Sequence, residues 1–159
     1  MSKCIAYYSK DGNTKAMAEA FAEKQKCDII ALVDPSSYKG IFGFLKAGFT
    51  SARKKACEMP QEVLDKIASY DELFLATPVW AGYGAPAFNA VLQGIDLSCK
   101  KVSVLTTQSD ENITGAEKRD AFFKAYIEKK GGEFVKLYGF AGSKMGDKPR
   151  DKQAFLDQI

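Results

Sequence analysis

The sequence predicts an α/β fold, a three-layer, doubly wound domain in which helices cover both faces of a five-stranded parallel sheet. Two observations predict it: five short apolar runs occur along the chain, and amphipathic stretches with helical spacing separate them. This alternation favours parallel pairing, because parallel neighbours need crossover connections, which are right-handed. The chain has 159 residues, 46% of them hydrophobic, which suits a single domain over 1–159 with a sizeable core.

The five apolar runs have the length and β-rich composition of strands that are buried on both faces. They cover residues 4–8, 29–33, 73–76, 102–105 and 134–138. Residues 73–95 carry no charge, but they include proline and glycine residues that a membrane-spanning helix would tolerate badly. We therefore interpret this stretch as strand, loop and helix.

Apolar residues recur at helical spacing between the runs and after the last one, and each stripe predicts a helix that packs on the sheet. The stripes are Met17, Ala20 and Phe21; Val63, Leu64, Ile67 and Ala68; Ala87, Ala90 and Val91; Phe122, Ala125 and Tyr126; and Phe155, Leu156 and Ile159.

Residues 36–60 form an insertion that is too long for a plain strand-to-helix connection. Within it Ile41, Leu45 and Phe49 share one helical stripe, and a basic cluster lies beside them. We expect an inserted amphipathic helix between the second strand and the second helix. Three roles stay open: packing on its own domain, serving as a homodimer contact or a flap over a ligand, and, least expected, lying on a membrane surface.

The composition excludes several kinds of chemistry. The chain has no histidine, so a Ser-His-Asp or Cys-His pair and a histidine-containing zinc site are ruled out, and we expect no metal. The net charge of +3 is too small and scattered to argue for nucleic acid. The four cysteines lack C-x-x-C spacing, which favours reduced, mostly buried thiols in a cytoplasmic protein.

The loop after the first strand has the composition of an anion-binding turn. Small hydroxyl and amide side chains, one glycine for a tight turn and the free N–H groups of a helix N-terminus together suit a phosphate. The spacing matches neither a P-loop nor a dinucleotide-binding G-x-G-x-x-G. The alternative is that Asn13 or Thr14 only caps the helix. The residues of this loop are Ser9, Lys10, Asp11, Gly12, Asn13 and Thr14.

Two further loops follow strands at the same end of the sheet, where open parallel sheets bind ligands. After the third strand, Trp80 is placed to cover a flat ring while glycine-containing peptides approach the ring edge, although such a tryptophan also serves as core or lid. Residues 106–112, after the fourth strand, are rich in hydrogen-bonding side chains. Together the three loops predict a mononucleotide ligand with a large planar base. One loop suits its phosphate, one suits the face of the base and one suits the polar edges of the base.

The three loops resemble the FMN-binding loops of the flavodoxin-like family, and the similarity covers about residues 3–142. The resemblance implies the sheet order 2-1-3-4-5 and a non-covalent FMN. It also implies that the first loop holds the phosphate, the second lines the ribityl chain and isoalloxazine, and the third closes the pyrimidine side. The residues that we predict to bind the cofactor are Ser9, Lys10, Asp11, Gly12, Asn13 and Thr14; Thr77, Pro78, Val79, Trp80, Ala81, Gly82 and Tyr83; and Thr107, Gln108, Ser109 and Asp110.

Three functions stay open. The first is FMN-dependent electron transfer with a redox partner protein, in which no side chain acts as acid or nucleophile. The second is an NAD(P)H-dependent FMN oxidoreductase of quinones or similar small acceptors, with a nicotinamide donor. The third is a binding module without cofactor. Asp11 favours the third, because a carboxylate aimed at a phosphate is repelled unless it points outward or caps the turn.

Overall fold

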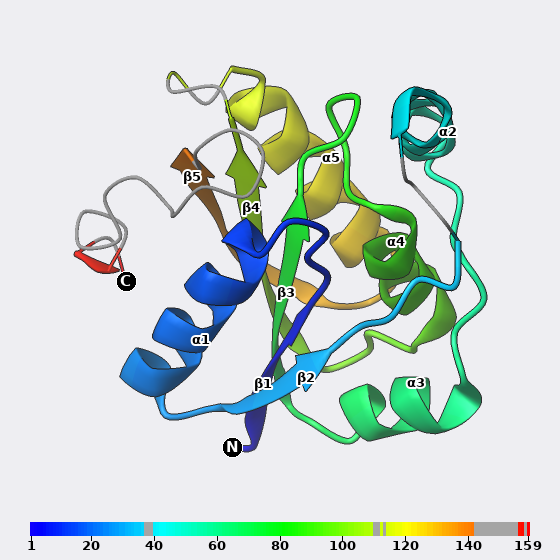
Figure 1. Ribbon diagram of the computed structural model, residues 1–159. Coiled ribbons are helices and arrows are strands. Elements are labelled where there is room, and N and C mark those ends of the chain that lie inside the picture. The colour runs from blue at the N-terminus through cyan, green and yellow to red at the C-terminus, as the bar shows by residue number, and fades with distance from the viewer. Residues whose placement is uncertain (37–39, 110–111, 113, 142–155, 158) are drawn as a thin grey trace.

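The computed structural model describes residues 1–36, 40–109, 112, 114–141, 156–157 and 159. Five parallel strands form one sheet in the order β2-β1-β3-β4-β5, as predicted (Figure 1). The strands are β1 (Lys3–Tyr7), β2 (Asp28–Ala31), β3 (Glu72–Pro78), β4 (Lys101–Gln108) and β5 (Glu133–Ala141). The helices are α1 (Asn13–Gln25), α2 (Gly40–Ala52), α3 (Gln61–Ala68), α4 (Pro86–Gly94) and α5 (Ala116–Lys129).

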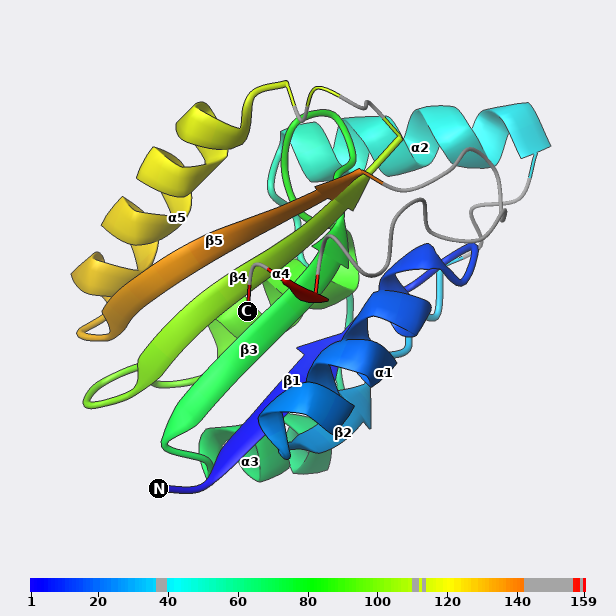
Figure 2. The same cartoon turned by 90° about the vertical axis from the view of Figure 1, so that its left-hand side faces the viewer.

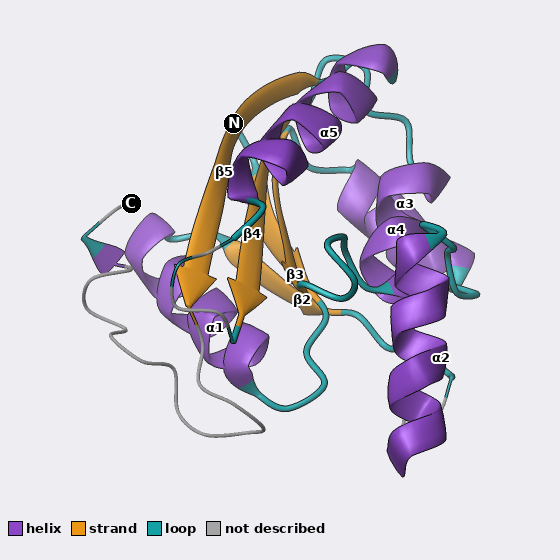
Figure 3. Cartoon of the chain, turned by 90° about the horizontal axis from the view of Figure 1, so that it is seen from above, coloured by secondary structure: helices purple, strands orange, loops and turns teal. Residues whose placement is uncertain are grey.

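Helices cover both faces of the sheet, and each face has its own apolar cluster (Figures 2 and 3). On one face α1 places Met17 and Phe21 against Phe74 of β3. On the other face α3, α4 and α5 pack together, with Phe88 and Phe123 fully buried. Crossover connections between parallel strands are right-handed, and the strand order here reverses beside β1. For this reason α1 lies on the opposite face of the sheet from α3, α4 and α5.

The two edge strands differ from the sequence prediction. The runs at 29–33 and 134–138 were expected to be buried on both faces, but Ile29 is 43% and Val33 72% exposed, and β5 is exposed or half-buried along most of its length. That part of the prediction is wrong. An edge strand has a neighbouring strand on one side only, so an apolar run there stays partly in water.

Four of the five helices predicted from apolar stripes are present as α1, α3, α4 and α5. The fifth, over 155–159, is described only at residues 156, 157 and 159, where Leu156 and Ile159 pack against the cluster under α1. The inserted helix of residues 36–60 is also present, as α2. Its expected apolar stripe does not face the domain, because Ile41, Leu45 and Phe49 are all more than half exposed.

Among the described residues, no helix is long and apolar enough to cross a membrane. All four cysteines are free, but only Cys4 is buried, while Cys27 and Cys57 are half-buried and Cys99 is exposed. The prediction of mostly buried thiols is therefore wrong. Three of the cysteines lie at the ends of elements or in loops, where apolar neighbours cover a side chain incompletely.

Candidate functional site

A cavity of about 380 Å³ opens at the carboxyl end of the sheet, where the loops after β1, β3 and β4 meet. This volume lies within the range of small-molecule sites. Twelve of the seventeen predicted site residues line it, and α2 supplies two more. The lining residues are Ser9, Lys10, Asp11, Asn13, Thr14, Ala47, Gly48, Pro78, Val79, Trp80, Ala81, Thr107, Gln108 and Ser109.

The first loop turns sharply into α1 at Gly12, whose φ of 90° lies in the left-handed region that favours glycine. The Gly12 N–H donates to Ser9 Oγ at 3.1 Å, which holds the turn closed. Gly12 occupies the N-cap position and no side chain caps the helix, so the alternative that Asn13 or Thr14 is the capping residue is wrong. The N-terminal turn of α1 therefore begins directly at this loop.

Thr14 connects the first loop to the third. Its hydroxyl oxygen lies 2.7 Å from that of Thr107, and both side chains are buried. The pair also fixes the distance between the N-terminus of α1 and the end of β4. At the same edge of the cavity the Val79 N–H donates to the Thr107 carbonyl at 2.8 Å, which brings the second loop into the same network.

The second loop is a tight turn that presents Trp80. The Trp80 and Tyr83 backbones exchange two hydrogen bonds, of 2.8 and 3.0 Å, around Ala81 and Gly82, whose φ angles are 47° and 86°. Two successive positive φ angles are typical of a type I′ turn. The indole packs edge-on against the Tyr8 ring, with centroids 5.6 Å apart. The turn therefore fixes the tryptophan beside the cavity.

Four predicted residues do not line the cavity, and the interactions of Thr77 and Tyr83 show how they support the loop. The Thr77 hydroxyl accepts from the Ala85 N–H at 2.9 Å and donates to the Pro78 carbonyl, so it ties together the two ends of the loop. The Tyr83 ring packs against Phe122, and Lys54 Nζ lies 4.5 Å from its centroid. The other two are Gly12 and Gly82.

The third loop brings Gln108 and Ser109 to the cavity, while Asp110 lies outside the described residues. Gln108 is the last residue of β4, and its amide contacts the guanidinium of Arg119 in α5. Sequence reasoning missed Arg119, because an arginine on a charged helix carries no pattern that indicates burial. Here it is only 3% exposed.

Comparison with solved structures bears on the fold. No protein-family model matches the sequence, and no curated protein matches it either. A flavoprotein in complex with FMN from Lactobacillus acidophilus NCFM superposes with a TM-score of 0.69 at 17% identity, covering 99% of this chain and 97% of that one. The two-electron reduced flavodoxin of Megasphaera elsdenii gives 0.55 at 18% identity, covering 91% and 90%. An NADH:FMN oxidoreductase gives 0.57 at 15% identity, covering 89% and 76%.

The chain has the flavodoxin-like fold. In this chain α2 shapes the site, since Ala47 and Gly48 form one wall of the cavity. Figure 2 shows α2 lying across the carboxyl end of the sheet. Sequence reasoning missed these two residues, because a small residue in an amphipathic stripe gives no sign of what it faces. The expected homodimer contact through 36–60 stays a prediction.

The C-terminal end of α2 is anchored to the rest of the flavodoxin-like domain. Lys54 Nζ sits 4.5 Å from the Tyr83 ring centroid and 4.4 Å from that of Phe122, an arrangement that attracts a cation to two ring faces. The Gln93 side chain donates to the Lys54 carbonyl at 2.8 Å. The Asn89 side chain donates to the Lys55 carbonyl at 3.1 Å. These contacts hold the helix that carries Ala47 and Gly48 beside the cavity.

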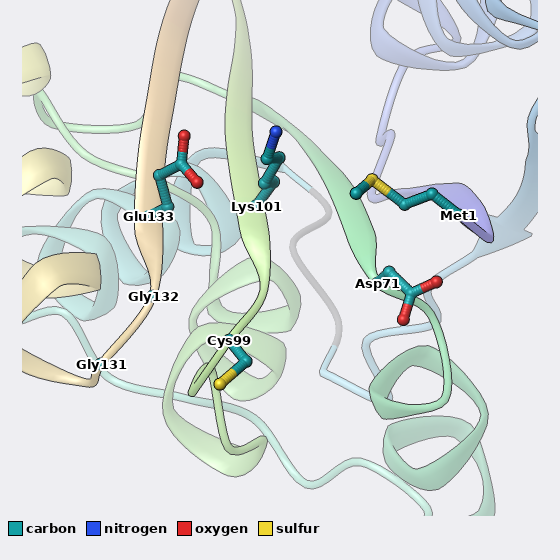
Figure 4. A pocket seen from close by; sticks show the side chains of 7 residues that line it. All are labelled: Met1, Asp71, Cys99, Lys101, Gly131, Gly132 and Glu133. Carbon is teal, nitrogen blue, oxygen red and sulfur yellow. The ribbon is translucent and has the colours of Figure 1, made fainter.

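A second hollow, of about 540 Å³, lies at the opposite end of the sheet (Figure 4). Asp71, Lys101 and Glu133 stand there at the starts of three neighbouring strands. The Asp71 carboxylate already accepts from the N–H and hydroxyl of Ser2, and these bonds lower the pKa of Asp71. Although this hollow is larger, it lacks the converging loops of the carboxyl end. The described residues also contain no group of acidic, cysteine or histidine side chains that could hold a metal ion.

Proposed function

We propose that this chain binds FMN at the carboxyl end of its sheet and uses it to transfer electrons. The observation that carries the proposal is the cavity in which the N-terminus of α1, a fixed tryptophan and a polar third loop meet. Bound FMN supplies reversible uptake of one or two electrons, and the protein supplies position and electrostatic environment. The L. acidophilus structure, which is similar over almost the whole chain, is a complex with FMN.

The first loop fits a phosphate in most respects. The N–H groups at the start of α1 and the positive end of its dipole favour an anion, and the first turn of α1 contains no acidic residue. Ser9 and Lys10 line the same part of the cavity and add a hydroxyl and a positive charge. Asp11 also lines the cavity and is exposed, so its carboxylate opposes the phosphate.

The second and third loops fit the isoalloxazine ring of FMN. Trp80 offers an aromatic face that is already held in place, and Val79 and Ala81 add apolar surface beside it. An apolar, aromatic surround makes the negative charge of a reduced flavin costly, so Trp80 is expected to lower the potential of the second electron. Gln108 and Ser109 provide hydrogen-bonding groups for the polar edge of the ring.

A second candidate function is favoured by α2. Because Ala47 and Gly48 form a wall of the cavity, a bound ring is covered on that side, and this favours exchange with small molecules over rapid exchange with a protein. The candidate is an NAD(P)H-dependent reductase of quinones or similar acceptors. In this case the electron donor is a nicotinamide, whereas an electron carrier needs a redox partner protein.

The test is the visible absorption spectrum of protein purified without added cofactor, followed by titration of the apoprotein with FMN and with riboflavin. We expect a two-banded flavin spectrum and much tighter binding of FMN than of riboflavin, because only FMN has the phosphate. A colourless protein that ignores FMN would overturn the proposal and leave a binding module without cofactor. NADH or NADPH oxidation by the holoprotein alone then separates the reductase from the electron carrier.

A further inference from the structure

Arg119 is buried in an unfavourable place. It lies in the first turn of α5 and is only 3% exposed. Burial removes the hydration of its positive charge, and the N-terminal end of a helix is itself positive, so two effects oppose a cation there. Unfavourable placements of this kind, such as a buried cation at a helix N-terminus, are most often found at functional sites. Arg119 contacts Gln108, which stands at the start of the third loop of the candidate site.

The hydrogen bonds of Arg119 determine how Gln108 is oriented. Arg119 Nη1 donates to the Thr114 carbonyl at 3.1 Å, and Nη2 donates to Gln108 Oε1. A guanidinium has only donors, so the amide atom that faces it must be the carbonyl oxygen. The nitrogen is bonded to the same carbon as that oxygen and therefore points in a different direction. This assignment follows from the chemistry of arginine.

Gln108 also lines the cavity, so the side chain whose carbonyl oxygen Arg119 contacts borders the space open to a ligand. We infer that Arg119 is a positioning residue: it holds the Gln108 carbonyl oxygen so that Gln108 Nε2 donates to an acceptor on the bound ring. The inference rests on the proposed FMN binding and deepens it. In FMN the acceptors on the polar edge are the pyrimidine carbonyl and imine groups.

The charge of Arg119 adds to the effect of orientation. A buried cation one amide away from the cavity polarises the Gln108 amide and makes its N–H groups stronger donors. Negative charge gained by the ring on reduction is then stabilised at this edge. Arg119 and Gln108 should therefore raise the reduction potential of bound FMN, whereas Trp80 opposes the same charge from the ring face.

The test is Gln108→Glu, which keeps the size of the side chain but replaces the amide N–H groups by an oxygen acceptor. The introduced carboxylate pairs with Arg119, so the melting temperature should not fall. We expect riboflavin affinity to fall about tenfold, because a donor to the ring becomes a repelling acceptor. Riboflavin is the probe because it lacks the phosphate, so repulsion of the phosphate does not contribute. The midpoint potential of bound FMN should become more negative.

Arg119→Lys is the second variant. Lysine keeps a positive charge and a donor for Gln108 but cannot also reach the Thr114 carbonyl as a rigid fork, so we expect a smaller loss of riboflavin affinity than in Gln108→Glu. A wild-type protein that binds no flavin would overturn the proposed function and this inference together. Normal flavin binding with riboflavin affinity and potential unchanged in Gln108→Glu would overturn only the inference.

Discussion

The hydroxyl oxygens of Thr14 and Thr107, 93 positions apart in the sequence, lie 2.7 Å from each other in a buried hydrogen bond. This bond joins the first turn of α1 to the end of β4, so it sets the gap between the loop assigned to the phosphate and the loop assigned to the pyrimidine edge. The threonine pair is therefore a structural brace of the site.

Replacing Thr14 by valine should destabilise the protein by about 1–3 kcal/mol, because the Thr107 hydroxyl would be left buried without its partner. Valine has nearly the shape of threonine, so little of the loss comes from packing. Chemical denaturation measures the change. The double variant Thr14→Val, Thr107→Val should lose less than the sum of the two single variants. Additive losses would mean that the hydroxyls are satisfied independently.

Trp80→Ala should weaken the binding of both FMN and riboflavin and shift the potential of bound FMN. The indole is the one large aromatic surface of the second loop that lines the cavity, and its edge contact with Tyr8 at 5.6 Å orients it there. Fluorescence titration and redox potentiometry give the two quantities. Trp80→Phe is the matched control and should keep much of the affinity. Wild-type affinity and potential in the alanine variant would place the ring elsewhere.

Asp11→Asn should raise FMN affinity about threefold at low salt, because removing one exposed negative charge near the phosphate removes a screened repulsion. Riboflavin affinity should not change, and the gain for FMN should shrink as salt is added. Glu23→Gln, which removes an exposed charge near the far end of α1, is the control. Equal FMN affinity in wild type and Asp11→Asn would show that Asp11 points away from the phosphate.

The central part of the fold could be predicted because β1, β3 and β4 are buried on both faces, and a continuous apolar run is the direct consequence. The edges could not be predicted in the same way. Ile29 and Val33 are as apolar as the residues of β1, but a sequence does not say how many neighbours a strand has. The exposure of Ile29 follows from the position of β2 at the edge of the sheet, and Val33 lies just beyond the end of that strand.

The three loops of the candidate site could be predicted because a parallel sheet gathers the carboxyl ends of its strands at one side. What escaped prediction depends on contacts between distant segments. Ala47 and Gly48 form a wall only because the end of α2 is anchored by Lys54. Arg119 matters only because α5 places it behind Gln108. Neither relationship leaves a periodic or compositional sign in the chain.

The free energy of unfolding should fall above about pH 9, and part of this loss should come from the Cys4 thiol. Burial raises the pKa of its thiol from 9.0 to about 12 in the folded protein. A raised pKa means that the contribution to stability is fully present below the unfolded value of 9.0 and is lost as the pH rises toward 12. In this range the unfolded thiol ionises while the folded one stays protonated. At pH 10.5 the loss from this thiol should approach about 2 kcal/mol.

Guanidinium denaturation at pH 8 and pH 10.5 measures this loss, and Cys4→Ala serves as the reference. The alanine variant should be less stable than wild type at pH 8, because it leaves a small cavity beneath the sheet. Between pH 8 and pH 10.5 the alanine variant should nevertheless lose less unfolding free energy than wild type. The contributions of tyrosines and lysines are common to both proteins and cancel in this comparison. An equal loss in the two proteins would mean that the Cys4 thiol ionises as readily in the folded chain as in the unfolded one, which its complete burial in β1 argues against.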